Sequence, residues 1–485
     1  MRFIGRSEEL LILQELMKKP LAVATITGRR RVGKSRLVAE LARRSGCRLI
    51  KIEGRDSEHA DNATELAAFA ADLSQCVGIP GFSFATWNAA FTALGALLQR
   101  QGKRRAKGTL VLLDEITWLA RYDESCLAEL KVFIDRYING SGHTLILCGS
   151  VSQWIEQRIN DSDLFVGRIS RKIRLEPLPL PDCAQFWDSR EVSAREILTA
   201  LCVTGGVPRY LEEIDPTASA EWNIRQLCFA PSGYMVHELP SLLRSSFVKA
   251  SREHALERYL AILASLSDHG KTAAEIATAI GVDNNEGLKD NLTGLVLSGL
   301  ISENPSWNLK SRTLAPRKQH YRIEDPYTRF YIKYIRPALG EIEKGHYEKI
   351  SLRQLPDWET IRGLQFQCLV TPRMVPSLLQ RLRLDGVLIL RSGPYYQSAT
   401  RRRKPAQIDY LLQTADTLYV CETKFRKHID ASVIDEVRQK IDRLEKDPGL
   451  SVRKALIYSG ERAPGLKQSA YFEHQIDVAD LLRGE

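Results

Sequence analysis

The sequence predicts an α/β protein with more than one domain, and two pairs of apolar runs carry this prediction. Residues 22–27 (AVATIT) and 110–113 (LVLL) are short apolar runs of the kind that forms buried strands. The first leads into a glycine-rich loop, and the second ends in two acids. Residues 407–412 and 418–425 alternate apolar and polar positions, as strands do, and also carry acids. Stretches with apolar residues at helical spacing lie between these runs, so helices and strands are expected to alternate.

Length and composition bound the class of protein. A chain of 485 residues is too long for one ordinary domain, and about three are expected. No apolar run approaches a membrane span and the N-terminus has no apolar signal region, so a cytoplasmic protein without membrane contact is expected. The nine cysteines form no C-x-x-C pairs, which disfavours zinc sites and a disulfide framework. The net charge of +10 permits a nucleic-acid partner without requiring one.

The glycine-rich loop, GRRRVGKS, matches G-x-x-x-x-G-K-[ST], the phosphate-binding P-loop. In such a loop the glycines let the backbone approach the phosphates, and N–H groups at the start of the next helix bind the anion. Lys34 is expected to reach the β- and γ-phosphates of ATP, and Ser35 to ligate Mg²⁺. The expected nucleotide-binding residues of this segment are Gly28, Arg29, Arg30, Arg31, Val32, Gly33, Lys34, Ser35 and Arg36.

The acids that end the second run complete the expected ATPase site. Asp114 is expected to hold Mg²⁺ together with Ser35, and Glu115 to polarise the attacking water. Residues 144–148 (TLILC) predict a further buried strand that leads to Ser150, which either senses the γ-phosphate or belongs to an ordinary turn. Arg168 either stabilises charge in the transition state, from its own chain or a neighbour's, or forms a surface salt bridge.

Six segments occur in a defined order: FIGRSEEL, GRRRVGKS, LLDE, CGS, VGRIS followed by LEPL, and GGVPRY from residue 205. Together they resemble the archaeal-type ATPase family, which belongs with the signal-transducing and AAA+-related P-loop ATPases. The resemblance covers about residues 1–235. It implies an ATP-binding core with a helical lid, in which the opening GR-x-x-EL segment and the segment containing Pro208 bracket the nucleotide.

Residues 236–340 predict a winged helix-turn-helix. Residues 256–266 and 286–298 have helical spacing, and Thr272 to Glu275 form a capping box before a short helix that Gly281 closes. Two strands flanking a loop follow. The expected recognition helix, EGLKDNL, is not basic, which argues against tight base reading. Phosphate contacts by the wing and a role as hinge or partner surface both stay open; the wing's basic residues are Lys310, Arg312, Arg317 and Lys318.

Residues 341–485 carry a second candidate site. Side chains two apart on a strand share a face, so Glu422 and Lys424 point the same way, and a hairpin would bring Asp409 beside them. Two carboxylates and a lysine can hold Mg²⁺ and activate water for phosphodiester hydrolysis, although a solvated strand face is the alternative. With a following helix that contains Gln439, the set resembles the PD-(D/E)XK nuclease superfamily over residues 360–460.

Two further features bear on this domain. The superfamily often carries a glutamate on an early helix, where this sequence has Gln367; Glu359 would have to substitute, or the domain would bind without cutting. With one carboxylate fewer, Mn²⁺ is expected to support cleavage better than Mg²⁺.

Residues 371–404 hold Tyr395, Tyr396, one acid and eight basic residues, which predicts phosphate binding and base stacking, or a solubilising loop. The basic residues are Arg373, Arg381, Arg383, Arg391, Arg401, Arg402, Arg403 and Lys404.

These expectations combine into a P-loop NTPase core with a helical lid (residues 1–235), a winged helix-turn-helix (236–340) and a smaller α/β restriction-endonuclease-like domain (341–485). The expected function is Mg²⁺-dependent ATP hydrolysis coupled to DNA binding and metal-dependent DNA cleavage. The alternative is an ATP-dependent switch or signalling scaffold whose idle nuclease-like domain only binds a partner. Whether the protein forms a homo-oligomer or takes a protein partner stays open.

Overall fold

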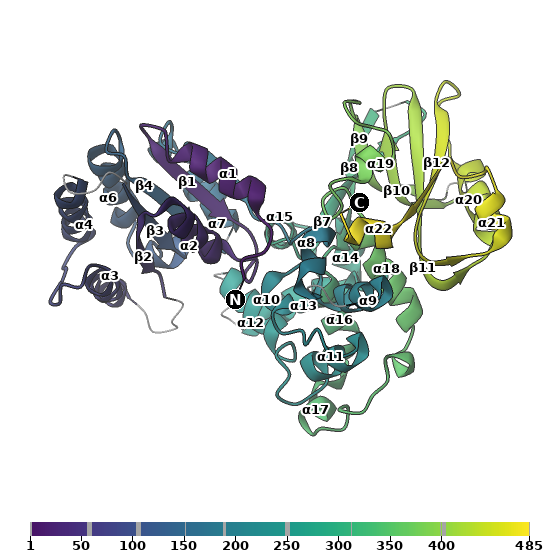
Figure 1. Cartoon of the computed structure of the whole chain (residues 1–485), viewed down its shortest axis with the longest axis horizontal. Helices are drawn as coiled ribbons and strands as arrows, with labels where there is room; N and C mark the ends of the chain where they lie inside the picture. Colours follow the sequence, from purple (N-terminus) through teal and green to yellow (C-terminus); the bar gives the residue numbers. More distant parts are fainter. Residues whose placement is uncertain are drawn as a thin grey trace. The chain divides into compact units, whose positions relative to one another are not determined.

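The computed structural model describes residues 2–55, 61–102, 108–150, 152–187, 191–247, 253–311, 313–397, 399 and 404–484. The chain divides into two compact units. The first unit comprises Met1–Glu176, Pro240–Glu257 and Thr293–Gly299, and the second comprises Pro177–Leu239, Arg258–Leu292 and Leu300–Glu485. Among the described residues, no helix is long and apolar enough to cross a membrane. Figure 1 labels the elements of both units.

The first unit is built on a parallel sheet of five strands in the order β2-β3-β4-β1-β5. The strands are β1 (Ala22–Thr27), β2 (Arg48–Glu53), β3 (Thr109–Asp114), β4 (Thr144–Cys148) and β5 (Arg171–Arg174). Every residue of β1, β3 and β4 is buried, as expected for central parallel strands that are covered on both faces. The predicted α/β core with a parallel sheet is therefore confirmed.

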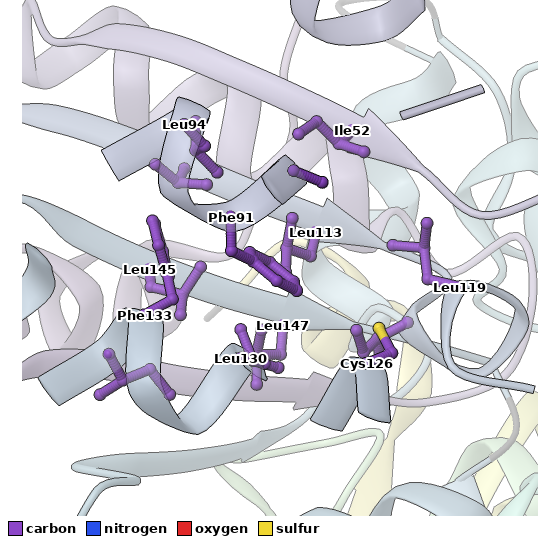
Figure 2. Packing of buried hydrophobic residues seen from close by; sticks show 14 of the residues in the cluster. Ile52, Phe91, Leu94, Leu113, Leu119, Cys126, Leu130, Phe133, Leu145 and Leu147 are labelled. Carbon is purple, nitrogen blue, oxygen red and sulfur yellow. The ribbon is translucent and has the colours of Figure 1, made fainter. Parts of the chain in front are cut away.

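Helices of the first unit cover the two faces of this sheet. They are α1 (Ser7–Leu16), α2 (Lys34–Ser45), α3 (Asn62–Val77), α4 (Trp87–Gly102), α5 (Ile116–Leu119), α6 (Ser125–Phe133) and α7 (Ser152–Ile155). Alternate strand residues face different cores: Val111 and Leu113 pack with α3, α4 and α6, whereas Leu112 packs with α1 and α2. Figure 2 shows the first of these cores, in which the rings of Phe91 and Phe133 lie with centroids 5.5 Å apart.

The second unit begins with a group of helices: α8 (Leu180–Ala184), α9 (Ala194–Thr204), α10 (Pro208–Leu211) and α11 (Ala220–Cys228). The helices α12 (Glu238–Ser246), α13 (Glu253–Ser265), α14 (Ala273–Ile280) and α15 (Glu286–Leu297) follow along the chain. Most of α12, the start of α13 and the end of α15 belong to the first unit. The capping box predicted at Thr272 and Glu275 is present, and Gly281 ends α14 in the left-handed conformation with φ 68°. The short strand β6 (Lys271–Thr272) pairs with a hairpin of β7 (Ile301–Asn308) and β8 (Thr313–Ile323) in an antiparallel sheet.

The C-terminal sheet has five strands in the order β13-β12-β11-β10-β9. They are β9 (Arg391–Gln397), β10 (Ala406–Gln413), β11 (Thr417–Ile429), β12 (Ser451–Arg462) and β13 (His474–Asp477). The pairs β9–β10 and β10–β11 are antiparallel, whereas β11–β12 and β12–β13 are parallel. The parallel pair β11–β12 needs a crossover, which contains α20 (Ser432–Arg443). The other helices here are α16 (Pro326–Phe330), α17 (Arg336–Glu343), α18 (Trp358–Leu369), α19 (Leu378–Arg381), α21 (Pro464–Gln468) and α22 (Val478–Leu482).

Helices α18 and α20 pack on opposite faces of β11. Phe366 of α18 stacks on Phe425 with ring centroids 5.1 Å apart. Val437 of α20 shares a core with Leu418 and Val420, whose side chains lie on the other face of the strand because side chains alternate. Glu422 and Lys424 lie on the same face as Val420, and they therefore face α20.

The β7–β8 hairpin packs against the C-terminal sheet. Trp307 and Leu309 are buried in the hydrophobic cluster of β9, β10 and β11, and the rings of Trp307 and Tyr395 meet edge to face at 5.3 Å. Lys310 lies near this contact, with Nζ 3.8 Å from Glu445 Oε1. Of the other basic residues expected on the wing, Arg312 and the side chains of Arg317 and Lys318 lie outside the described residues. The hairpin is thus part of the core of the C-terminal sheet.

We expect Trp307→Ala to lower the stability of the second unit by about 3–5 kcal/mol, because a large buried ring leaves a cavity behind. The measurement is the urea midpoint of unfolding. Trp222→Ala is the matched control, since Trp222 is 40% exposed and loses little packing. Equal midpoints for the two variants would contradict the buried position of Trp307.

Candidate active sites

The P-loop has the backbone that its sequence predicts. Gly28 and Gly33 have φ values of 137° and 93°, a region that favours glycine. A Cβ on Gly28 would lie 2.4 Å from the carbonyl oxygen of Leu175, so no larger residue fits there without a shift. Helix α2 starts at Lys34 with no side-chain cap, which leaves its first N–H groups directed at the loop for an anion. Arg6 of the opening segment donates from Nη2 to the Val32 carbonyl at 3.2 Å and so ties that segment to the loop.

Lys34 lies over the P-loop and reaches the end of β4. Its Nζ donates to the carbonyl oxygens of Gly28 at 3.0 Å and Arg29 at 3.2 Å, and to Ser150 Oγ at 3.1 Å. The side chain is buried. The ammonium therefore sits at the centre of the loop, held by weakly basic oxygens that a phosphate would outcompete.

Ser35 and Asp114 meet beside the loop. Ser35 Oγ donates to Asp114 Oδ2 at 2.5 Å, and Lys51 Nζ lies 3.3 Å from the same oxygen. Asp114 ends β3 and is buried. A hydroxyl and a carboxylate oxygen at hydrogen-bond distance form a donor set of the type that Mg²⁺ takes, so these residues fit the predicted metal.

Glu115 is held in an unusual backbone conformation next to Ser150. It has φ 50° and ψ 49°, a left-handed conformation that costs free energy in a residue with a side chain. Its carboxylate accepts from Ser150 N at 3.0 Å and from Ser150 Oγ at 2.5 Å. Since the same hydroxyl accepts from Lys34, an unbroken chain of hydrogen bonds joins Lys34 to Glu115 through Ser150.

The remaining nucleotide-site candidates lie in different surroundings. Arg168 donates from Nε and Nη2 to the two carboxylate oxygens of Asp135, at 2.8 and 3.0 Å, so in this structure it forms the salt bridge that was its alternative interpretation. Its guanidinium lowers the pKa of Asp135. Pro208 is the first residue of α10, in the second unit. Arg29 is buried, whereas Arg30 and Arg31 are partly exposed.

Arg36 lines a cavity of about 480 Å³ on α2, next to the opening segment of the chain. Its Nη2 donates to the carbonyl oxygen of Arg2 at 3.2 Å. Phe3 and Glu40 also line the cavity. An aromatic ring and charged groups therefore line the cavity beside Arg36, the residue that follows the P-loop serine.

The C-terminal candidates come together as the hairpin predicts. Tyr410 pairs with Cys421, and continuing this antiparallel register by one residue sets Asp409 opposite Glu422. Both carboxylates are buried, with exposed fractions of 8% and 1%. Asp409 Oδ2 accepts from Thr423 N at 3.0 Å and from Thr423 Oγ1 at 2.8 Å.

Two lysines hold the Glu422 carboxylate. Lys424 Nζ lies 2.9 Å from Oε1, and Lys440 Nζ lies 2.6 Å from Oε2 and 3.7 Å from Asp409 Oδ1. Lys424 also donates to Glu436 Oε2 at 2.7 Å. Burial lowers the pKa of Lys440, but the Asp409 and Glu422 carboxylates outweigh this effect and raise it, so the ammonium stays charged.

Sequence reasoning missed Lys440 and Glu436, and it singled out Gln439 instead, which is exposed. The missed signal is the helical spacing of Val433, Glu436, Val437 and Lys440. These positions share one face of a helix, and the two valines show that this face is buried. The polar residues at the other two positions therefore face β11 as well.

Helix α18 brings no acid to this site. Glu359 forms an ion pair with Arg362 of its own helix. Gln365 is buried, where it accepts from Arg329 at 2.7 Å and donates to the Pro326 carbonyl at 2.6 Å, and Gln367 is only partly buried. Among the residues that the structure describes, no group of three or more His, Cys, Asp or Glu side chains is arranged to hold a metal.

The base-stacking role expected of Tyr395 is wrong, and the ring of Tyr396 already has a stacking partner within the chain. Tyr395 is buried against Trp307, and the ring of Tyr396 stacks on His320 at 4.9 Å. The docked β7–β8 hairpin supplies both ring contacts, which the order of residues along the chain does not show. Arg381 and Arg383 are exposed, whereas Arg401, Arg402 and Arg403 lie outside the described residues.

Known proteins are similar to parts of this chain. An uncharacterized protein of Methanocaldococcus jannaschii is 22% identical over 369 residues, which span 75% of each chain. A Walker-type ATPase of Pyrococcus abyssi has a TM-score of 0.48 at 19% identity, over 68% of this chain and 96% of that one. The ORC2 protein of Aeropyrum pernix, in ADPNP–ADP complexes, has a TM-score of 0.42 at 15% identity, over 71% and 95%. Residues 3–214 match the family described as "ATPase domain predominantly from Archaea".

Proposed function

We propose that this protein binds ATP with Mg²⁺ at the P-loop and hydrolyses it, and that this cycle controls DNA binding and DNA cleavage by the C-terminal domain. The observation that carries the proposal is the hydrogen-bonded chain from Lys34 through Ser150 to Glu115, beside the Ser35–Asp114 pair. Lys34, the candidate phosphate-binding residue, and Glu115, the candidate general base, are therefore both hydrogen-bonded to the Ser150 hydroxyl.

The arrangement suggests how bound ATP would prepare hydrolysis. The β- and γ-phosphates attract the Lys34 ammonium more strongly than the Gly28 and Arg29 carbonyls do, so Lys34 turns toward them. Ser150 then loses a donor, and its bonds to Glu115 rearrange. Glu115 takes a proton from the attacking water as general base. Ser35 and Asp114 would hold Mg²⁺, which would supply positive charge beside the phosphates.

The domain boundaries expected from the sequence are part of the proposal. Residues 1–235 form the ATPase with its lid, to which Pro208 contributes. Residues 236–340 form a winged helix from α13, α14 and α15 with the β6–β8 sheet. Residues 341–485 form the nuclease-like domain. The cavity beside Arg36 and Phe3 would receive the adenine, whose flat ring suits a contact with an aromatic side chain.

The proposed cleavage rests on Asp409, Glu422 and Lys424. Two carboxylates on neighbouring strands supply oxygen donors for Mg²⁺ or Mn²⁺, and so the donor type fits a divalent metal. Such a metal supplies a Lewis acid and an activated water. Lys424, 2.9 Å from Glu422, would offset charge that builds up on the phosphate.

A second candidate function is a nucleotide switch whose C-terminal domain only binds a partner. The observation that favours it is that helix α18 brings no carboxylate to the site, since Glu359 pairs with Arg362 and Gln365 serves the core. Cleavage assays on duplex, branched and single-stranded DNA with Mn²⁺ or Mg²⁺ separate the two. Cleavage that is lost in Glu422→Ala supports the nuclease, whereas DNA binding without cleavage supports the switch.

We expect Glu115→Gln to leave ATP bound and to slow hydrolysis by about a hundredfold to ten-thousandfold, because only the general base is removed. Lys34→Ala is expected to abolish ATP binding itself. Equilibrium binding and single-turnover hydrolysis measure the two effects. Hydrolysis by Glu115→Gln at the wild-type rate would show that another group activates the water.

We expect Ser150→Ala to slow hydrolysis about tenfold or more while ATP affinity changes little, because Glu115 loses a hydrogen-bond partner that positions its carboxylate. Ser141→Ala is the matched control. Ser141 precedes β4 and Ser150 follows it, so the two serines lie at opposite ends of one strand. Equal rates of ATP hydrolysis for the two variants would show that Ser150 only forms a turn and does not position Glu115.

We expect DNA binding to weaken steeply with salt, since phosphate contacts release counterions. Replacing residues 401–404 with alanine is expected to flatten the salt dependence, by about 0.9 in the log–log slope for each DNA phosphate that these side chains neutralise. A control variant removes the exposed Lys344 and Lys349 instead. Binding with an unchanged slope in the first variant would exclude this segment from the DNA interface.

A further inference from the structure

We propose that the Lys440 ammonium is a built-in counter-cation of the Asp409–Glu422 pair, and that a divalent metal and Lys440 compete for the same place. The inference rests on the metal chemistry proposed for this domain and adds its regulation. The metal site is closed at rest and opens when the phosphate of a DNA substrate draws Lys440 away.

The first argument is the position of Lys440 Nζ. It lies 2.6 Å from Glu422 Oε2 and 3.7 Å from Asp409 Oδ1, and so it bridges the two acids. The same two carboxylates would hold a divalent metal, because they supply the oxygen donors that such a metal prefers. The other two oxygens are also occupied, Glu422 Oε1 by Lys424 and Asp409 Oδ2 by Thr423. All four carboxylate oxygens therefore have partners while Lys440 is in place.

The second argument is the cost of burying charge. Glu422 is 1% exposed and Asp409 is 8% exposed, and two buried carboxylates side by side are unfavourable without cations. Lys424 is shared with Glu436, so its charge does not balance the pair alone. Lys440 supplies the missing positive charge. Either the Lys440 ammonium or a divalent metal can neutralise the two carboxylates. If both were present, their positive charges would repel each other.

The third argument is that Lys440 is able to leave. Its side chain is 26% exposed, whereas that of Lys424 is 12% exposed. It projects from α20 on a flexible stem of four carbons, so the ammonium can turn outward while the helix stays packed through Val433 and Val437. A phosphate oxygen is a strong partner for a departing ammonium. DNA and metal are therefore expected to bind cooperatively.

The test is Mn²⁺ binding to the full chain without nucleotide, measured by the electron paramagnetic resonance signal of free Mn²⁺. The Asp114→Asn background removes the candidate metal ligand of the P-loop site. We expect Lys440→Met and Lys440→Gln to raise Mn²⁺ affinity about tenfold or more, equivalent to about 1.4 kcal/mol. Lys467→Met, which removes an exposed lysine, is expected to change nothing. Adding Asp409→Asn to Lys440→Met is expected to abolish the gain.

A stability measurement separates competition from a purely structural lysine. In EDTA both Lys440 variants are expected to melt at lower temperature, and Mn²⁺ is expected to restore much of that loss, because it replaces the missing charge. A loss that Mn²⁺ does not restore, with unchanged Mn²⁺ affinity in both variants, overturns the proposal. If neither variant folds, the Mn²⁺ affinity of the wild-type chain decides. This affinity is expected to rise when duplex DNA is added, and an unchanged Mn²⁺ affinity overturns the proposal. Raised affinity without DNA cleavage supports the competition and rejects the nuclease function.

Discussion

The candidate nucleotide site depends on the parallel pairing of β1, β3 and β4. Parallel strands end at one edge of their sheet, so this pairing brings the P-loop, the Asp114–Glu115 acids and Ser150 together, although more than a hundred residues separate the P-loop from Ser150 along the chain. The contacts at that edge are electrostatic: Lys34 reaches Ser150, and Ser150 reaches Glu115. The packed cores on both faces of the sheet hold these groups in place. The sheet therefore sets the position of the candidate site, and the residues at the ends of β1, β3 and β4 supply its chemical groups.

In the C-terminal candidate site, an antiparallel pair of strands brings the polar residues together. The register of β10 and β11 sets two buried acids side by side, and that arrangement is unfavourable unless cations neutralise them. Helix α20 provides a cation from the crossover between β11 and β12. The same helix positions Lys424 through Glu436. One helix thus sets both the charge balance of the pair and the placement of the candidate catalytic lysine.

Local signals predicted much of this structure. The strand–loop–helix around Lys34 and the strand ending at Asp114 follow from apolar runs and glycines, and the proximity of Asp409 to Glu422 follows from hairpin geometry. Contacts between elements distant in sequence were not predictable in this way. The burial of Tyr395 under Trp307 joins two regions that were assigned to different domains. Lys440 was missed because a charged residue on a helix usually faces solvent, and only its spacing from Val433 and Val437 reveals the buried face.

The most direct test of the account is a structure of the chain with Mg²⁺ and a slowly hydrolysed ATP analogue. The account predicts that Lys34 leaves Ser150 for the β- and γ-phosphates, that Ser35 and Asp114 face the metal, and that Glu115 turns toward the water in line with the γ-phosphate. A nucleotide bound away from the P-loop would contradict it. So would a filled P-loop in which Lys34, Ser150 and Glu115 keep their present hydrogen bonds.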